Sequence, residues 1–172
     1  MAIDSAELAA RVAAAVPASG AVPFAMPGDG AIEIASVTAA DVACFLRDDP
    51  ELSLRLFTDI TVVDYEAQRG ELEVIYVLRS PTSGERVVMK ARVDAADPRV
   101  PTLSDLFAGA NWAEREAYDM FGVQFEGHPD LRRILMYEEF HGHPLRKSYP
   151  YQQRQPLTPE RDPIADPWPK KR

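Results

Sequence analysis

Residues 71–79 read Glu-Leu-Glu-Val-Ile-Tyr-Val-Leu-Arg, which is the clearest strand pattern in the chain. Every second residue from Leu72 onward is apolar, so one face of this strand is expected to face a core. A similar alternation runs over residues 86–93, and a long β-branched and aromatic run covers residues 52–65. Short connections that contain turn residues, such as 80–84, join these runs. We therefore predict an antiparallel meander of three strands.

The residues before this meander predict a fourth strand and a helix. Residues 31–37 alternate as in a strand, and Thr38 begins a helix whose apolar face includes Val42 and Leu46. Thr38 and Asp41 resemble a capping box. This helix is a crossover long enough to allow parallel pairing of the strands on either side of it. We predict an α+β two-layer sandwich, with a mixed four-stranded sheet and helices on one face.

The ends of the chain show helix and linker signals. Residues 5–16 read as a short amphipathic helix, and residues 17–30 read as a linker because they contain three prolines and three glycines. Seven of the 15 prolines fall between Pro144 and Pro169, and a tail of this composition is expected to be disordered or to lie extended along another protein. We predict a sheet domain at 1–101, a region packed on it at 102–150, and a partner-binding tail at 151–172.

Two further helices are predicted after the sheet domain. Thr102 is expected to cap a short helix that ends near Gly109. Asn111 is expected to cap the next helix, where Glu114 at the third position completes a capping box. Gly122 is the expected left-handed residue that ends this second helix.

The second of these helices has an unusual mixture of charged and aromatic side chains. Arg115 and Asp119 are four residues apart and are expected to form an ion pair on its surface. Trp112, Tyr118 and Phe121 lie between the charges, a composition typical of protein interfaces. The pattern therefore favours docking to another protein over a merely solvated helix.

Two Gly-His-Pro sequences follow, at 127–129 and 142–144, and a basic pair comes soon after each one. We expect each to form a rigid turn whose imidazole bonds to backbone and which aims the adjacent basic side chains. The pairs are Arg132-Arg133 and Arg146-Lys147. This dense polar region contains no nucleophile elbow, dinucleotide loop or phosphate loop. It predicts a docking subunit that neither catalyses alone nor binds NADH or flavin.

The three histidines leave a metalloprotein as an alternative. His128, His141 and His143 lie in one short region with Glu138 and Glu139, so a zinc or iron site is conceivable. No His-Glu-x-x-His spacing occurs, and this favours the turn interpretation. A free-standing binding module with an extended tail is a third possibility.

Composition excludes several other classes of function. The formal net charge of -8 argues against a primary role in binding nucleic acid, which needs a basic surface. No apolar stretch reaches the ~20 residues that span a bilayer, and the N-terminus does not read as a signal peptide. The single cysteine, Cys44, permits no intrachain disulfide and cannot ligate an iron–sulfur cluster by itself.

The polar region carries a family resemblance. Glu-Arg-Glu-Ala-Tyr-Asp-Met-Phe at 114–121, followed by His128 and by Arg-Arg-Ile-Leu at 132–135, resembles the signature of the "30 kDa" C-type subunit of proton-pumping NADH:quinone oxidoreductase, respiratory complex I. Gly-His-Pro-Leu-Arg-Lys at 142–147, followed by Tyr-Pro at 149–150, is similar to that family's second hallmark.

The resemblance is specific over residues 102–150 and rests on architecture over 1–101. The family often has Asp where this chain has Ser148. It implies a peripheral-arm subunit without redox centres of its own, which packs on the large D-type subunit and adjacent iron–sulfur subunits as part of a hetero-oligomer. The FMN and iron–sulfur clusters are then carried by partners, and the assembly couples electron transfer from NADH to quinone with proton translocation.

The resemblance also implies an interface and a location. A similar domain occurs in a membrane-bound hydrogenase family, which is the alternative membership. The expected location is the cytoplasmic side of the bacterial inner membrane, or the equivalent matrix side, where partners hold the chain. The implied interface residues are Glu114, Arg115, Glu116, Tyr118, Asp119, Phe121, His128, Arg132, Arg133, His143, Arg146 and Lys147.

Overall fold

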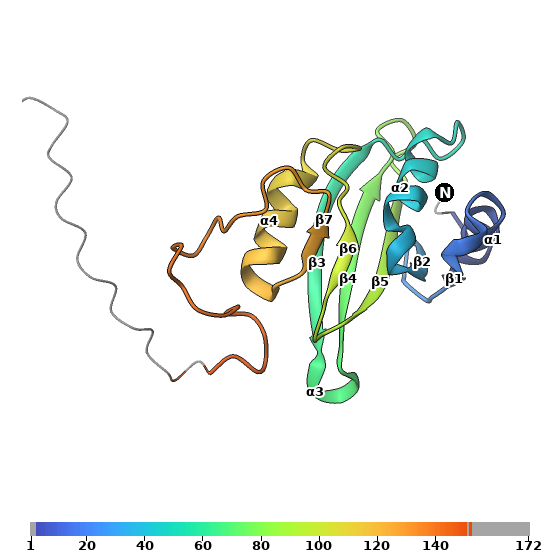
Figure 1. Ribbon diagram of the computed structural model, residues 1–172. Helices are drawn as coiled ribbons and strands as arrows, with labels where there is room; N and C mark the ends of the chain where they lie inside the picture. The colour runs from blue at the N-terminus through green and yellow to red at the C-terminus, as the bar shows by residue number, and fades with distance from the viewer. Residues whose placement is uncertain (1–2, 151, 153–172) are drawn as a thin grey trace, which may run out of the picture.

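The computed structural model describes residues 3–150 and residue 152, and a five-stranded mixed sheet forms its centre (Figure 1). The strand order is β1-β2-β5-β4-β3, and two further strands, β6 and β7, pair in parallel beside it. The α+β class is confirmed, with one strand more in the main sheet than the four predicted. The strands are β1 (Val22–Pro23), β2 (Gly30–Ala35), β3 (Leu56–Tyr65), β4 (Glu71–Arg79), β5 (Arg86–Asp94), β6 (Arg99–Pro101) and β7 (Gln124–Glu126).

The three longer helices pack on one face of this sheet, as predicted. Buried apolar residues of α1, α2 and α4 form a single cluster with alternate residues of the strands, including the fully buried Tyr76 of β4. The opposite face carries ion pairs of 3.0–3.5 Å that join Glu33 and Glu73 to Lys90 and Arg92. The helices are α1 (Ser5–Ala15), α2 (Ala39–Asp48), α3 (Glu66–Arg69) and α4 (Ala110–Phe121), with 3-10 turns at Pro17–Ser19 and Ser36–Thr38.

The predicted three-strand meander is confirmed. β3 pairs antiparallel with β4, and β4 pairs antiparallel with β5. Strand β3 begins at Leu56, later than the predicted start at Leu52. The reason is that Leu52 and Leu54 are buried beside the end of α2, where the Leu54 amide donates to the Leu46 carbonyl at 3.0 Å. Leu52 and Leu54 therefore pack with the helix layer, and the strand starts after them.

The parallel pairing forms with a different partner from the one expected. Strand β2 pairs in parallel with β5, with Ile32 opposite Met89, while α2 carries the chain across to β3 at the far edge of the sheet. The predicted linker at 17–30 is also partly wrong. It contains β1, in which Val22 lies opposite Glu33 and extends the sheet beyond β2. Its prolines and glycines thus surround a very short edge strand.

Helix α2 lacks the predicted capping box. The Thr38 side chain makes no capping bond to α2; its hydroxyl instead donates to the Ala35 carbonyl at 2.8 Å within the preceding 3-10 turn. Helix α1 has a true side-chain cap, because the Asp4 carboxylate accepts the amides of Ala6 and Glu7 at 3.1 Å.

One core serves both of the first two predicted regions. The buried cluster joins Val74 and Met89 of the sheet to Leu103 and Phe125 of region 102–150. The predicted tail at 151–172 lies outside the described residues, apart from residue 152. None of the helices among the described residues has the length and apolar composition of a membrane span.

Candidate functional site

The candidate site is built around α4 and the segment that follows it. Two predictions for the residues at and before the start of α4 are wrong. Residues 104–106 and 108–109 form turns, so the short helix expected between Thr102 and Gly109 is absent from this described stretch. Helix α4 begins at Ala110, one residue before the expected cap Asn111, and Gly109 occupies its N-cap position without a side-chain bond. Glu114 therefore completes no capping box.

Glu114 instead has a buried role inside the chain. Its carboxylate accepts the Leu103 amide at 2.6 Å and contacts the Thr102 hydroxyl at 2.5 Å, and its side chain has no exposed surface. These bonds tie the 102–105 turn to the first half of α4. Burial is the main cause that raises the pKa of Glu114 to about 7 from an ordinary 4.5, and the two hydrogen bonds only partly offset it.

His128, from the first Gly-His-Pro turn, lies beside Glu114. Its Nδ1 accepts the Asp130 amide at 3.0 Å, and its Nε2 is 3.2 Å from the Asn111 carbonyl. Because the amide can only donate and the carbonyl can only accept, the ring is neutral with its hydrogen on Nε2. Gly127 supplies the left-handed backbone of the turn with φ 85°. The prediction that this imidazole bonds to backbone is confirmed.

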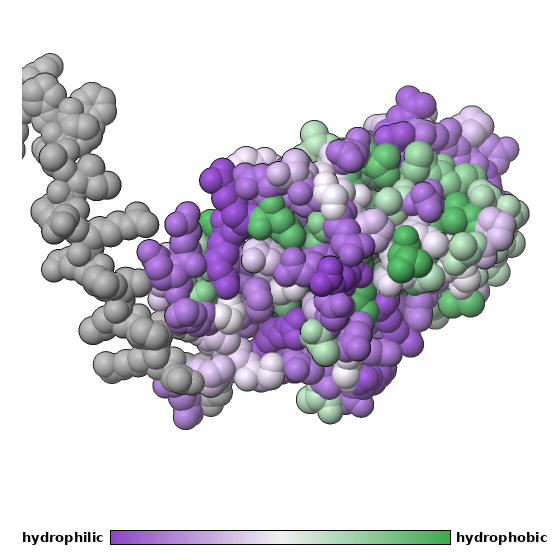
Figure 2. Space-filling view, in the orientation of Figure 1, coloured by the Kyte–Doolittle hydropathy of each residue, from purple (hydrophilic) through white to green (hydrophobic). Residues whose placement is uncertain are grey.

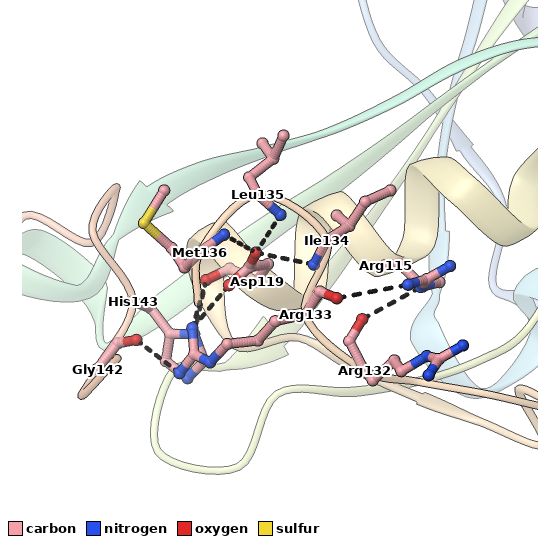
Figure 3. A network of polar contacts seen from close by, with 9 residues as sticks. All are labelled: Arg115, Asp119, Arg132, Arg133, Ile134, Leu135, Met136, Gly142 and His143. Carbon is pink, nitrogen blue, oxygen red and sulfur yellow. Dashed lines mark hydrogen bonds and ion pairs between the residues drawn. The ribbon is translucent and has the colours of Figure 1, made fainter. Parts of the chain in front are cut away.

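The buried carboxylate of Asp119 accepts several hydrogen bonds from the segment after that turn, as Figure 3 shows. One oxygen accepts Arg133 Nη1 at 2.7 Å, and the other accepts three consecutive backbone amides at 2.8–3.1 Å. Burial raises the pKa of a carboxyl, but these donors outweigh it and lower the pKa of Asp119. The three amides belong to Ile134, Leu135 and Met136.

The predicted ion pair between Arg115 and Asp119 is wrong. Arg115 donates to the carbonyls of Arg132 and Arg133, at 3.2 and 3.4 Å (Figure 3). Its guanidinium lies 5.0 Å from the centre of the Trp112 ring. The helix therefore binds the same segment in two ways. A guanidinium of the helix donates to carbonyls of the segment, and a carboxylate of the helix accepts from its amides.

The C-terminal end of α4 is held by the second Gly-His-Pro turn. His143 Nδ1 is 3.1 Å from the Asp119 carbonyl, and Arg146 Nε donates to the Phe121 carbonyl at 2.6 Å. Such donors satisfy the carbonyls that a helix end leaves free. Gly122 ends the helix with φ 80°, as predicted. Burial is the main cause that lowers the pKa of His143.

A strand carboxylate that sequence reasoning missed anchors the last part of the segment. Asp64 in β3 is 3% exposed and accepts the Lys147 amide at 2.7 Å. The sequence indicates it as a charged residue at a core-facing position, because Asp64 continues the alternate positions occupied by Ile60 and Val62 in β3. Next to it, the Ser148 hydroxyl is 2.9 Å from a Glu66 carboxylate oxygen.

Each basic pair divides into an inward and an outward cation. Arg133 keeps 15% of its side-chain surface exposed and Arg146 also keeps 15%, since both bond to backbone and to carboxylates. Arg132 is 71% exposed and, among the described residues, forms an ion pair with the exposed Asp130, while Lys147 is also exposed. The inward members hold the segment in place, and the outward members face solvent.

The predicted interface set is thereby sorted by exposure. Three of its members, Glu116, Arg132 and Lys147, are exposed. Glu114 and Asp119 are buried within the chain, the His128 side chain has no exposed surface, and the other six residues are half-buried. Figure 2 shows a largely hydrophilic surface around α4, interrupted by hydrophobic patches. The exposed large apolar and aromatic side chains of this region are Trp112, Leu135, Tyr137 and Leu145.

The described histidines give no metal site. Across residues 3–150 and 152, no group of three His, Cys, Asp or Glu side chains is arranged to hold a metal ion. His128 and His143 are each engaged with backbone groups.

Comparison with known proteins gives a consistent result. Residues 32–155 match the family described as the 30 Kd subunit of respiratory-chain NADH dehydrogenase. The chain is 44% identical over 150 residues to the C-type subunit of NADH-quinone oxidoreductase from Roseiflexus sp., covering 87% of this chain and 86% of the relative. The same subunit of Xanthobacter autotrophicus is 44% identical over 146 residues, which cover 84% of this chain and 68% of the relative.

Two solved structures share the fold. The trypsin-resistant fragment of Nqo5 has a TM-score of 0.58 and 32% identity, and the match covers 72% of this chain and 99% of that one. The second is a chain of the membrane-bound sulfane sulfur reductase, an archaeal respiratory membrane complex. It has a TM-score of 0.67, and the match covers 91% of this chain and 96% of that one. Its identity is 24%, so it shows the fold alone.

Proposed function

Because this chain belongs to the family of the 30 Kd subunit of respiratory-chain NADH dehydrogenase, we propose that it is a structural, non-redox subunit in the peripheral arm of NADH:quinone oxidoreductase. In this role it docks on the large D-type subunit and neighbouring iron–sulfur subunits. It supports electron transfer from NADH to quinone, coupled to proton translocation, on the cytoplasmic or matrix side of the membrane.

The division of each basic pair is the observation that carries this proposal. Arg133 and Arg146 fix the 127–149 segment on α4, and Arg132 and Lys147 project from the segment that they fix. An exposed charge held on an immobilised backbone gives a partner register and specificity at a small entropic cost. This arrangement of fixed and exposed cations supports a docking surface.

The cofactors are assigned to the partners. An iron–sulfur cluster is normally held by four thiolates, and this chain has one cysteine. The sequence also contains neither a Walker loop nor a dinucleotide-binding glycine pattern. We therefore assign FMN and the iron–sulfur clusters to other subunits. Membership of a membrane-bound hydrogenase-type complex is the alternative, and the relatives at 44% identity favour the NADH-quinone oxidoreductase over it.

Charge reversal at Arg132 tests the docking role. The Arg132→Glu variant is expressed in place of the native chain, and the complex is purified through another subunit. We expect a severalfold loss of this chain and of the large subunit from the purified complex, because a partner carboxylate then meets a like charge. The isolated variant should unfold at the same temperature as the native chain, since the Arg132 side chain is 71% exposed and its ion-pair partner among the described residues, Asp130, is 53% exposed.

The matched control is Arg79→Glu. Arg79 is also exposed and lies at the end of β4, outside the 102–150 region. This variant should assemble as the native chain does. Normal assembly and turnover of the Arg132→Glu complex would count against the proposed docking surface.

A further inference from the structure

We propose that Glu114 is a buried proton-binding site that exchanges with solvent through the hydroxyl groups of Thr102 and Ser104. The proposal concerns the chain alone and does not depend on the proposed function. Three observations support it: a buried carboxylate without a cationic partner among the described residues, a continuous line of hydroxyls, and neutral or negative groups around the carboxylate.

The carboxylate of Glu114 is unusual beside that of Asp119 on the same helix. Neither residue has exposed surface. Asp119 is bonded to a guanidinium and three amides, whereas Glu114 has one amide and one hydroxyl as hydrogen-bond partners among the described residues. Burial without a compensating cation favours the neutral form of a carboxyl group. Of the two groups, Glu114 is therefore the one that takes up a proton.

Two hydroxyls connect this carboxylate to the surface. Thr102 Oγ1 is 2.5 Å from Glu114 Oε2 and 2.8 Å from Ser104 Oγ, and it also accepts the Ser104 amide at 3.0 Å. Thr102 is buried, while Ser104 is half-buried. The line therefore runs from the interior to the surface within three residues of one turn.

The line is satisfied in both protonation states of Glu114. When Glu114 is ionised, Ser104 donates to Thr102 and Thr102 donates to the carboxylate. When Glu114 is protonated, it donates to Thr102, and Thr102 donates to Ser104. To pass between these states, Ser104 accepts a proton from a hydronium ion, each hydroxyl passes its own proton inward, and Oε2 gains one proton while a water molecule is released.

The groups named here from neighbouring elements place no positive charge beside Glu114. His128, from the turn after β7, lies 4.0 Å away in its neutral form, because its Nδ1 accepts an amide. Tyr76, from β4, is fully buried, and its hydroxyl has no hydrogen-bond partner among the described residues. Asp105, from the preceding turn, adds a negative charge that also raises the pKa of Glu114.

Carboxyl carbon NMR of the full chain tests the site. The chain is labelled with carbon-13 at its glutamate side-chain carboxyls, and the Glu114 signal is identified by its absence in Glu114→Gln. We expect this signal to titrate with a midpoint near pH 7. A midpoint near the ordinary value of 4.5 would overturn the proposal.

Loss of one hydroxyl tests the route. Ser104→Ala keeps the contact between Thr102 and Glu114 but removes the outer hydroxyl, so the midpoint should stay near pH 7 while proton exchange, measured from line broadening, slows severalfold. Ser83→Ala removes a hydroxyl from the turn between β4 and β5 and should change neither quantity. An unchanged exchange rate in Ser104→Ala would overturn the route, and its midpoint would show separately whether the site stands.

Discussion

Gly122 and His143 pack so closely that a β-carbon on Gly122 would lie 2.7 Å from two atoms of the imidazole ring. The same glycine ends α4 with φ 80°, and its amide donates to the Tyr118 carbonyl at 2.8 Å. One residue therefore terminates the helix and leaves room for the second Gly-His-Pro turn to close over its end.

Replacing Gly122 by Ala should destabilise the chain for two separate reasons. A left-handed backbone costs a residue with a β-carbon about 1–2 kcal/mol. The imidazole must also move away, which weakens its bond to the Asp119 carbonyl. Gly84→Ala is the control, because Gly84 has φ 77° with nothing within 4 Å of the added carbon. Urea unfolding should show a larger loss for Gly122→Ala, and equal losses would contradict the packing argument.

Replacing Asp119 by Asn should loosen the segment bound to α4. The change removes the charge that balances Arg133 and leaves a weaker acceptor for the amides of Ile134, Leu135 and Met136. We expect a loss of about 3 kcal/mol in unfolding free energy, as for other buried charge pairs that lose one partner. Hydrogen exchange at these three amides should accelerate.

The exposed pair in the same segment is the control for Asp119. Asp130 is 53% exposed and bonds to Arg132 at 3.0 Å. Asp130→Asn should change the unfolding free energy by less than about 1 kcal/mol, because exposed ion pairs contribute little. If both variants lost the same stability, Asp119 would not be the anchor of the segment.

Stability should depend on pH through Glu114. Its pKa is about 7 in the folded chain and 4.5 ordinarily, so the unfolded chain releases this proton first as pH rises. The stability that the protonated form gives is complete below pH 4.5, decreases as pH rises to 7, and is lost above it. The expected change is about 3 kcal/mol. Glu114→Gln should lack this component when its urea unfolding is compared with the native chain across the same pH range.

The Ser148 position tests a departure from the family pattern. Its hydroxyl lies 2.9 Å from Glu66, so Ser148→Asp places two carboxylates together. Arg146, 3.7 Å from Glu66, reduces the repulsion, and the site is exposed. We expect a loss below about 1 kcal/mol by thermal unfolding. Adding Glu66→Gln should restore the stability, and a failure to restore it would mean that another contact of Ser148 matters more.

The sheet could be predicted because its signal is local. Alternation over residues 71–79 and 86–93 places one face of each strand in the core, and short connections leave only antiparallel pairing. The partner of β2 could not be predicted, because α2 permits parallel pairing without specifying a neighbour. The two missed elements, β1 and the pairing of β6 with β7, are two or three residues long and have no usable periodicity.

The errors at α4 have one physical origin. Glu114 fits a capping box, and Arg115 with Asp119 fits a surface ion pair, because both rules describe a helix in isolation. Tertiary contacts override them here, since the buried carboxylates bind backbone amides of other segments. Adjacent basic residues likewise gave no indication of which cation turns inward. The histidine turns were predictable because Gly and Pro restrict the backbone locally.

The pairing of Gly30 with Val87 has a consequence for biosynthesis. Strand β2 leaves the ribosome long before β5 is synthesised, so during this time its apolar residues lack the strand with which they pair. The meander of β3, β4 and β5 can assemble first, because its pairings are between consecutive strands. Until β5 has emerged, we expect the apolar residues of the nascent N-terminal portion to be exposed, so slow translation after residue 94 would favour productive maturation over aggregation.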